Sequence, residues 1–367
     1  MQNRKHTHNT SAKNIPVRVA LAAFGMSGRV FHAPLITSHP GLELTKVLER
    51  SGSRHAMDAY PGVESVTGLE DILSDPAIDL VVINTPEHTH YDMVKKALET
   101  GKHVVVEKAF TVTSREARHL IAVAAKRRLV LSVFQNSRFH GDFRTIRQIL
   151  KDKLLGRVVE CEIHYDRYRP GIQASSWKEK SLPGTGTLYN LGVHMIDQAL
   201  VLFGWPQALF CDLGIQRSRG KVPDYFELTL YYEGLRVILK SSYLVKTPGP
   251  RYILHGTKGS FVKYGTDPQE AMLKAGVRPG ASDWGSEPEE CWGQLETEIE
   301  GMTSKRKVAT IRGSYMDYYD NIRKVLRGKA TLLVRPEEAM RNIEIIEAAL
   351  KSNRTRRVVQ LDKVRHD

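Results

Sequence analysis

Cysteine is scarce in this chain, and long hydrophobic runs are missing. The 367 residues include three cysteines, Cys161, Cys211 and Cys291, which stand far apart in the sequence. Because they are odd in number and form no Cys-x-x-Cys pair, we expect neither a disulfide framework nor a metal site. This pattern fits a reducing, cytoplasmic compartment. No apolar stretch approaches the length that a membrane-spanning helix needs, so we expect no membrane partner.

Acidic residues are outnumbered by basic ones. The chain has 54 Lys and Arg against 41 Asp and Glu, which gives a formal net charge of +13. The basic residues are spread along the sequence, and no helix-turn-helix, zinc-finger or RNA-recognition signature accompanies them. We therefore expect a solvated basic surface, or attraction to an anionic cofactor, and no nucleic-acid partner.

A glycine-rich turn follows the first apolar run. Residues 17–24 are mostly apolar, as in a buried parallel strand, and lead into the turn Ala23-Phe24-Gly25-Met26-Ser27-Gly28. Such a turn is typical of dinucleotide-binding folds, in which backbone N–H groups bind the pyrophosphate. We expect Gly25 to let the backbone approach the phosphates and Gly28 to let the next helix pack closely. Ala23 replaces the first glycine of this fingerprint, and a glycine-rich turn without a ligand is the alternative.

The length of the chain predicts two domains, because it exceeds one typical hydrophobic core. Residues 1–14 are polar and are expected to form a disordered basic arm. In residues 15–136, apolar runs alternate with helical patterns, which predicts a Rossmann domain with a doubly wound parallel sheet. Residues 137–367 predict an α+β domain with an open, mostly antiparallel sheet. We expect its last helix, 336–352, to pack back on the first domain.

The patterns also predict the individual elements. In the first domain we expect strands at 42–48, 79–84, 103–106 and 129–133, and helices at 69–73, 91–100 and 113–128, the last opened by a capping box at Thr113 and Glu116. In the second domain we expect helices at 143–150, 188–203, 315–327 and 336–352, and strands at 158–165, 226–232, 236–244, 252–255 and 260–263. Residues 265–312 predict an irregular excursion, anchored by Trp284 and Trp292.

The motifs and their order resemble one family. They are the glycine turn, Asn84-Thr85-Pro86 with His90, Glu107-Lys108-Ala109, and the segment 184–197, which contains Asn190-Leu191-Gly192-Val193-His194. The chain resembles the glucose-fructose oxidoreductase / inositol dehydrogenase (Gfo/Idh/MocA) family of NAD(P)-dependent oxidoreductases from about Val17 to about Val359. In that family the lysine motif ends in proline instead of Ala109, and the histidine motif begins with aspartate instead of Asn190.

The resemblance implies hydride transfer between nicotinamide and a secondary alcohol or carbonyl of a sugar, polyol or cyclitol. It also implies a homodimer or homotetramer formed through the open sheet. Two alternatives remain open: a catalytically quiet NAD(P)-binding or regulatory protein, which Asn190 and Ala109 would favour, and a redox-assisted glycoside hydrolase.

Lys108, His194 and Asn190 are the expected catalytic residues. Lys108 follows a buried strand at the carboxyl edge of the sheet, where ligands of such folds bind. His194 lies one helical turn after Asn190, so both can face the same side, and histidine exchanges protons near neutral pH. Asn190 cannot act as a general base, but its amide can bind substrate or orient His194. Asp197 is a second candidate to orient His194, with a surface or capping role as the alternative.

Cofactor binding is expected from the glycine turn and from the ends of the following strands. The residues are Ala23, Gly25, Met26, Ser27, Gly28, Glu49, Arg50, Asn84, Thr85, Pro86, His90, Glu107 and Lys108. At the second strand, Glu49 would bind the ribose diol of NAD, and Arg50 would accept the 2′-phosphate of NADP. We favour NAD slightly, because Glu49 comes first. A plain helix-start role for His90 is the alternative. Candidate substrate residues are Arg138, Tyr165, Arg167, Arg169, Trp177 and Asp197.

Overall fold

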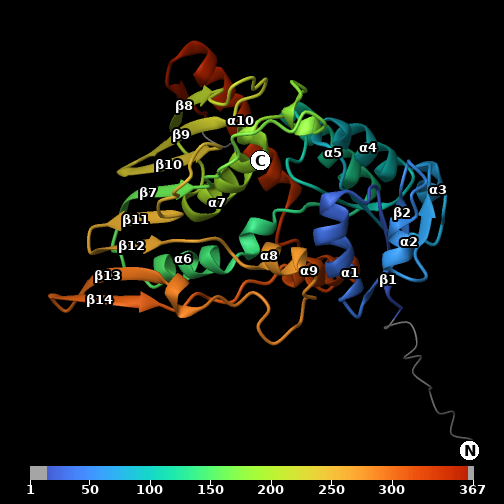
Figure 1. Cartoon of the computed structure of the whole chain (residues 1–367), viewed down its shortest axis with the longest axis horizontal. Helices are drawn as coiled ribbons and strands as arrows, with labels where there is room; N and C mark the ends of the chain where they lie inside the picture. The colour runs from blue at the N-terminus through green and yellow to red at the C-terminus, as the bar shows by residue number, and fades with distance from the viewer. Residues whose placement is uncertain (1–14, 363–367) are drawn as a thin grey trace, which may run out of the picture.

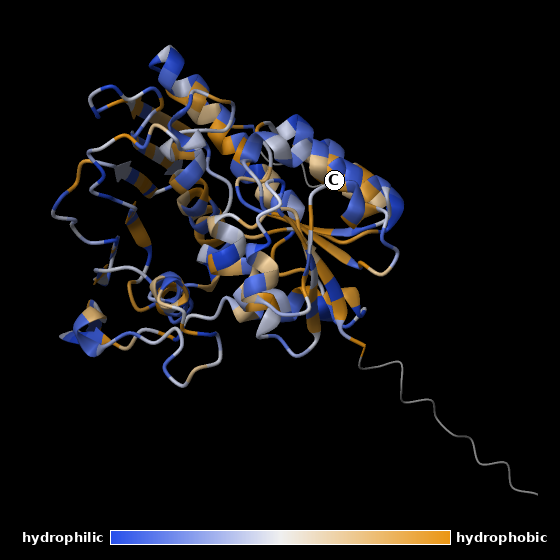
Figure 2. Ribbon diagram, turned by 45° about the vertical axis from the view of Figure 1, so that its right-hand side comes forward, coloured by the Kyte–Doolittle hydropathy of each residue, from blue (hydrophilic) through white to orange (hydrophobic). Residues whose placement is uncertain are grey.

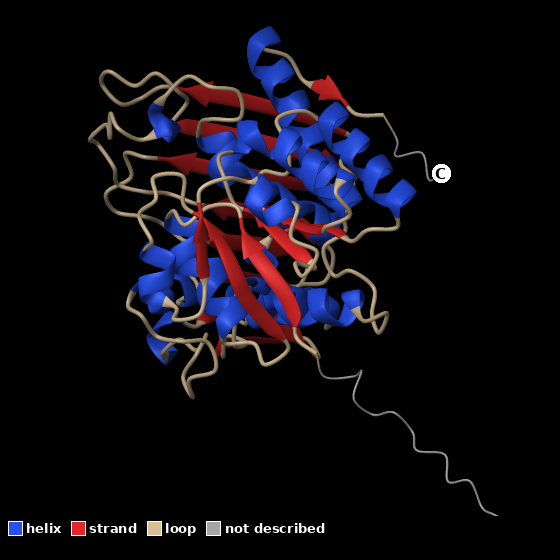
Figure 3. Ribbon diagram, turned by 90° about the vertical axis from the view of Figure 1, so that its right-hand side faces the viewer, coloured by secondary structure: helices blue, strands red, loops and turns tan. Residues whose placement is uncertain are grey.

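The computed structural model describes residues 15–362 of the chain (Figure 1). The arm predicted over residues 1–14 lies outside the described residues. Within the described part, each of two β-sheets forms the centre of its own layer of the molecule, and helices lie between the sheets (Figures 1 and 3). None of the helices in residues 15–362 is long and apolar enough to cross a membrane.

The first sheet is parallel throughout, with strand order β3-β2-β1-β4-β5-β6. Its strands are β1 (Val17–Leu21), β2 (Leu42–Leu48), β3 (Glu64–Val66), β4 (Leu80–Ile83), β5 (His103–Val106) and β6 (Leu131–Val133). The helices between them are α1 (Ala33–Thr37), α2 (His55–Ala59), α3 (Glu70–Leu73), α4 (His90–Glu99) and α5 (Ser114–Arg127). This is the strand order of a dinucleotide-binding domain, which confirms the predicted doubly wound sheet.

Continuous burial explains why these strands were visible in the sequence. Every residue of β4 and of β6 is buried, because helices cover both faces of the sheet. Figure 2 shows the apolar strands enclosed by helices whose outer faces are hydrophilic. The capping box of α5 is confirmed: Thr113 Oγ1 accepts from Glu116 N at 3.3 Å, and Thr113 N donates to Glu116 Oε2 at 3.0 Å.

The second sheet has the order β14-β13-β12-β11-β7-β10-β9-β8-β15. Its strands are β7 (Val158–His164), β8 (Ala208–Gly214), β9 (Tyr225–Tyr232), β10 (Leu235–Ser242), β11 (Tyr252–Gly256), β12 (Gly259–Lys263), β13 (Gly293–Ile299), β14 (Met302–Val308) and β15 (Val359–Gln360). Within this second sheet, only the β7–β10 pair is parallel among the described strands. The mostly antiparallel sheet is therefore confirmed.

Helices cover one face of this sheet and leave the other open. The helices of this half are α6 (Gly141–Lys151), α7 (Val193–Phe203), α8 (Gln269–Lys274), α9 (Met316–Leu326) and α10 (Pro336–Thr355). Along β9, buried residues alternate with half-buried ones, as expected for a sheet that is covered on one side. In Figure 1, α6, α7 and α10 lie on the side that faces the first domain. There Glu347 of α10 accepts hydrogen bonds from Ser114 N and Oγ, at 2.9 and 2.7 Å.

The prediction of an irregular excursion over residues 265–312 is wrong. This segment contains α8 and the hairpin β13–β14, which extends the sheet to its edge. Most residues of β14 are exposed, and β13 buries only alternate side chains, so neither strand has the apolar run that signals a core strand. β8 was also missed. Trp284 of this segment is buried and Trp292 is partly buried.

Candidate active site

The two glycines of the first turn have different surroundings. At Gly25, a Cβ atom would meet nothing within 4 Å. At Gly28, it would lie 2.5 Å from the carbonyl oxygen of Ala23 and 3.0 Å from Nδ2 of Asn84. Gly25 therefore borders open space where a ligand can approach the backbone, whereas Gly28 allows close packing of the next helix on the strand. That helix begins with a π-helical turn, Gly28–His32, before α1.

Buried amide groups without partners lie at the carboxyl edge of the first sheet. Asn84 Nδ2 donates to Ala23 O at 2.9 Å, but Asn84 Oδ1 is buried and has no hydrogen bond within residues 15–362. Gln135, two residues after β6, is almost fully buried, and neither of its side-chain amide atoms has a partner in the same range. Buried polar groups normally find partners. These orphaned atoms follow β4 and β6, at the same edge of the sheet as the open space at Gly25, and fit a cofactor bound across this edge, as nucleotides are in doubly wound folds.

Glu49 is fully engaged by its own loop. Its carboxylate accepts hydrogen bonds from Ser53 Oγ (2.9 Å), His55 N (3.0 Å), Ala56 N (3.1 Å) and Ser65 Oγ (2.6 Å). Burial opposes ionisation of Glu49, but these hydrogen bonds outweigh it and lower its pKa. The carboxylate thus orders the loop after β2. The argument that Glu49 is free to bind a ribose diol fails.

His90 and Glu107 also form internal contacts. His90 is fully buried, with Nδ1 2.9 Å from Ala109 O and Nε2 2.8 Å from Thr85 O, so both ring nitrogens join the loops after β4 and β5. Glu107 Oε1 lies 3.1 Å from His32 Nε2, and Oε2 accepts from Lys108 N at 3.0 Å. Burial opposes ionisation of Glu107, yet His32 and Lys108 lower its pKa. These residues position Lys108 and the Thr85–Pro86 loop. The Lys108–Ala109 peptide bond is cis.

Lys108 meets Asn190 across the domain boundary. The Lys108 ammonium group donates to Asn190 O at 2.8 Å and lies 3.5 Å from Asn190 Oδ1. Lys178 Nζ approaches the same amide oxygen at 3.4 Å, while Asn190 Nδ2 donates to Tyr243 Oη at 3.2 Å. Asn190 lies in a second π-helical turn, Leu188–Gly192, which precedes α7. Such turns are frequent at functional sites.

His194 lies near this group and is held by the segment that follows β6. Its Nδ1 is 2.9 Å from Ser137 Oγ, just beyond β6, and its ring centroid is 6.5 Å from that of Tyr165. Burial and then the positive charge of Lys108 lower the pKa of His194 well below its usual value. The imidazole is therefore neutral at neutral pH. One of its nitrogens carries no proton and can accept one.

Two of the predicted substrate residues, Arg138 and Asp197, contact each other. Arg138 forms a bidentate ion pair with Asp197, at 2.6 and 2.7 Å, and donates to Glu338 at 2.7 Å. Asn342 Nδ2 donates to the same aspartate at 2.9 Å. Asp197 therefore does not orient His194, and the expectation that it does is wrong, because buried Arg138 neutralises its charge. Arg138 thus links Asp197 of α7 to Glu338 of α10.

The remaining candidates surround the Lys108–Asn190 contact. Tyr165 is buried and lies beneath the guanidinium of Arg251, whose Cζ is 3.7 Å from the ring centroid. The Trp177 ring is 6.3 Å from that of His88, so this segment reaches the loop after β4. Arg169 packs near the ring of Tyr243, with its Cζ 5.9 Å from the centroid. Arg167 is partly buried beside them.

Sequence reasoning missed several residues of this group: Ser137, Tyr243, Arg251 and Gln135. Ser137 and Gln135 follow β6 directly, so their position at the carboxyl edge of a parallel strand was a usable signal. Tyr243 and Arg251 had no comparable signal, because their roles depend on contacts with distant residues.

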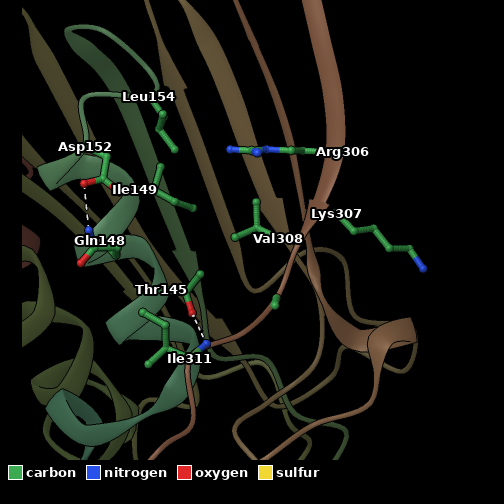
Figure 4. Close-up of a pocket in the computed structure, with 10 residues that line it drawn as sticks. Thr145, Gln148, Ile149, Asp152, Leu154, Arg306, Lys307, Val308 and Ile311 are labelled. Carbon is green, nitrogen blue, oxygen red and sulfur yellow. Dashed lines mark hydrogen bonds between the residues drawn. The ribbon is translucent and has the colours of Figure 1, made fainter.

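A separate pocket of about 340 Å³ lies between α6 and β14 (Figure 4). Ile149, Leu154 and Val308 line it, with Arg306 and Lys307 at its border. It contains none of the predicted site residues. Within residues 15–362, no group of three His, Cys, Asp or Glu is placed so as to hold a metal ion.

The fold and this site define a two-domain oxidoreductase that binds a nicotinamide dinucleotide. Residues 17–135 match the oxidoreductase family NAD-binding Rossmann fold, and residues 147–361 match the C-terminal α/β domain of the same family. The chain belongs to the Gfo/Idh/MocA family, whose members are NAD(P)-dependent dehydrogenases.

Relatives match almost the whole chain. The scyllo-inositol 2-dehydrogenase (NADP(+)) IolW of Bacillus subtilis is 40% identical over 347 residues, which cover 94% of this chain and 96% of IolW. The Escherichia coli oxidoreductase YdgJ is 41% identical over 341 residues, 93% of this chain and 97% of YdgJ. The solved structure of the Bacillus subtilis oxidoreductase yvaA superimposes with a TM-score of 0.92 at 38% identity, covering 95% of this chain and 99% of that chain.

The two glycines provide a matched test of the cofactor site. We expect Gly28→Ala to destabilise the first domain and abolish dinucleotide binding, because the added methyl group would collide with the Ala23 backbone. Gly25→Ala should keep the wild-type melting temperature within about 2 °C and weaken dinucleotide binding roughly tenfold or more, since the methyl group occupies only ligand space. Thermal melts and calorimetry measure both effects. Unchanged affinity in Gly25→Ala would show that no ligand approaches this turn.

Proposed function

We propose that this enzyme is an NADP(H)-preferring dehydrogenase that acts on a secondary alcohol of a sugar, polyol or cyclitol. The observation that carries the proposal is the contact of Lys108 with Asn190, beside neutral His194, at the carboxyl edge of the dinucleotide-binding sheet. Support for the substrate class comes from IolW, a scyllo-inositol dehydrogenase by name. The three cysteines are free in the structure, which supports a reducing compartment such as the cytoplasm.

The preference for NADP rests on the loop after β2. Glu49 has both oxygens occupied, whereas Arg50 and Arg54 are exposed and have no ion pair within the described part of the chain. Guanidinium groups bind phosphate oxygens in a bidentate manner. This loop therefore offers charge for a 2′-phosphate and no free carboxylate for a ribose diol. IolW is NADP-linked by name, which supports the same assignment.

The chemistry needs few groups from the protein. Oxidation of a secondary alcohol releases a hydride, which bound nicotinamide accepts, and a proton, which a protein group must accept. Lys108 lies where its ammonium group can hold the hydroxyl oxygen, exchanging its bond to Asn190 for one to substrate. Neutral His194 can take the proton, and Ser137 fixes its ring. Asn190 holds Lys108 and Lys178 in place and can bind a further hydroxyl.

We also propose that the open face of the second sheet is covered by a second copy of the chain. Side chains on that face are half-buried at alternate positions of β9, such as Tyr225 and Tyr231, rather than fully exposed. The family resemblance supports this arrangement. We expect sedimentation equilibrium to give a dimer or tetramer, and Tyr231→Glu to shift it toward monomer. A monomeric wild-type protein would contradict the proposal.

Arg50 tests the choice of cofactor. We expect Arg50→Ala to weaken NADPH binding roughly tenfold to a hundredfold, because about 1.5–3 kcal/mol of charged hydrogen bonding to phosphate is lost. NADH binding should change by less than about threefold. Arg306→Ala, on the distant strand β14, is the control and should change neither. Equal losses for the two cofactors, or tighter binding of NADH by the wild type, would show that this loop does not bind a 2′-phosphate.

Lys108 and His194 test the chemistry. With the best substrate from a panel that includes scyllo-inositol, Lys108→Ala and His194→Ala should each lower kcat by about 10²-fold or more. Calorimetry should show unchanged NADPH affinity for both variants, and Lys307→Ala serves as the surface control. Full activity in both variants would place the reaction elsewhere. Cofactor binding without turnover of any panel member would favour a catalytically quiet protein.

A further inference from the structure

Positive charge converges on Asn190 without a carboxylate among its direct partners. The ammonium groups of Lys108 and Lys178 lie 3.5 and 3.4 Å from Asn190 Oδ1, and this oxygen belongs to a neutral amide. Desolvation by the surrounding protein and the charge of Lys108 lower the pKa of Lys178. Like charges this close to one another destabilise a site unless a counter-anion shares it.

Two further cations border the same site, and we call them the arginine pair (Arg167 and Arg169). Their backbone is fixed beyond β7, because Arg167 N donates to Ser242 O at 2.9 Å and Arg169 N donates to Tyr243 O at 2.7 Å. They lie on either side of the bridge that Tyr168 forms with Leu244. Tyr165, two residues before Arg167, has its ring centroid 6.5 Å from that of His194.

The arginine pair has no partner in residues 15–362. No hydrogen bond or ion pair engages either guanidinium group, although Arg167 is partly buried. Burial and the neighbouring guanidinium of Arg251 lower the pKa of Arg167. Arg169 approaches only the ring of Tyr243, whose hydroxyl group binds Asn190. The charge of Arg169 acts on Lys178 and that of Arg167 acts on His194, so the pair lies close to the Lys108–Asn190 contact, and its donors are unused within residues 15–362.

Most acidic groups nearby have a partner of their own. Glu270 pairs with Lys274, Asp142 with Arg251, and Glu179 with Arg217, while Glu107 contacts the imidazole of His32. Glu87 is buried, its Oε2 has no partner within residues 15–362, and it acts on Lys178. Glu107 also acts on Lys178, and Glu270 acts on Arg167. Within the described residues, none of these carboxylates forms an ion pair with the four cations Lys108, Lys178, Arg167 and Arg169.

We propose that the substrate is an anionic polyol, with a carboxylate or phosphate group held by the arginine pair while its reacting hydroxyl group lies at Lys108. This inference rests on the proposed function and narrows its substrate class. A planar guanidinium fork suits a carboxylate or phosphate far better than a hydroxyl group. Asn190 is consistent with such a substrate, because an acid at this position would neutralise the lysines and repel the anion.

The test uses a matched series that differs only at carbon 1: D-glucitol, D-gluconate and D-glucitol 1-phosphate. Calorimetry measures the affinity of the NADPH-loaded protein for each compound. We expect at least one anion to bind tenfold or more tightly than D-glucitol. The better anion identifies the carboxylate or the phosphate as the recognised group. Loading with NADPH prevents the anions from binding at the phosphate site of the cofactor.

Variants of the arginine pair then test whether these two residues bind the anionic group. Arg167→Gln and Arg169→Gln should each reduce anion affinity at least tenfold and leave D-glucitol within threefold, whereas Arg306→Gln on β14 should change nothing. Arg167→Lys should restore part of the loss, because it keeps the charge but not the fork. Equal binding of all three compounds, no binding of either anion, or unaltered binding in both glutamine variants would overturn the proposal. Because turnover is not measured, failure of the redox assignment would appear separately, in the Lys108 and His194 kinetics.

Discussion

The bond between Lys108 and Asn190 is the contact on which the site depends. It joins the end of β5 in the first domain to the turn before α7 in the second. Tyr189 Oη donates to Val112 O at 2.9 Å, so the same two segments are tied together more than once. Ser137, in the turn after β6, also contacts His194 at 2.9 Å. A reactive group contributed by each domain is productive only if the domains are held in one relation to each other.

Buried polar contacts fix the residues on either side of Lys108. His32, from the turn after β1, contacts Glu107 with one ring nitrogen and the Tyr319 hydroxyl of α9 with the other, at 3.1 and 2.6 Å. His90 fixes the backbone on the other side of Lys108 through the carbonyl of Ala109. Residues that resemble cofactor ligands in the sequence thus act as supports for the lysine. A site built this way gains rigidity from groups that never need to touch the ligand.

The balance of charge differs between the α7–α10 contact and the surroundings of Asn190. Where acids and arginines meet in the α7–α10 contact, as in Arg138 with Asp197 and Glu338, each charge has a partner. Around Asn190 the cations outnumber the acids. The family's aspartate would change that balance by one charge, which is why an aspartate-to-asparagine difference can alter the substrate class as well as the proton relay.

The sequence by itself determined the architecture: the parallel sheet, the glycine turn, most helices and strands, and the positions of Lys108, Asn190 and His194 in the chain. These features depend on local patterns, namely apolar runs, periodicity and turn residues, which are written in sequence order. The tertiary structure alone decided that Glu49 is occupied by its loop, that Asp197 pairs with Arg138, and that β13 and β14 complete the sheet. It also decided that the side chains of Arg167 and Arg169 have no partner among the described residues. Those outcomes depend on which side chains, far apart in the chain, come within hydrogen-bond distance, and only packing sets those distances.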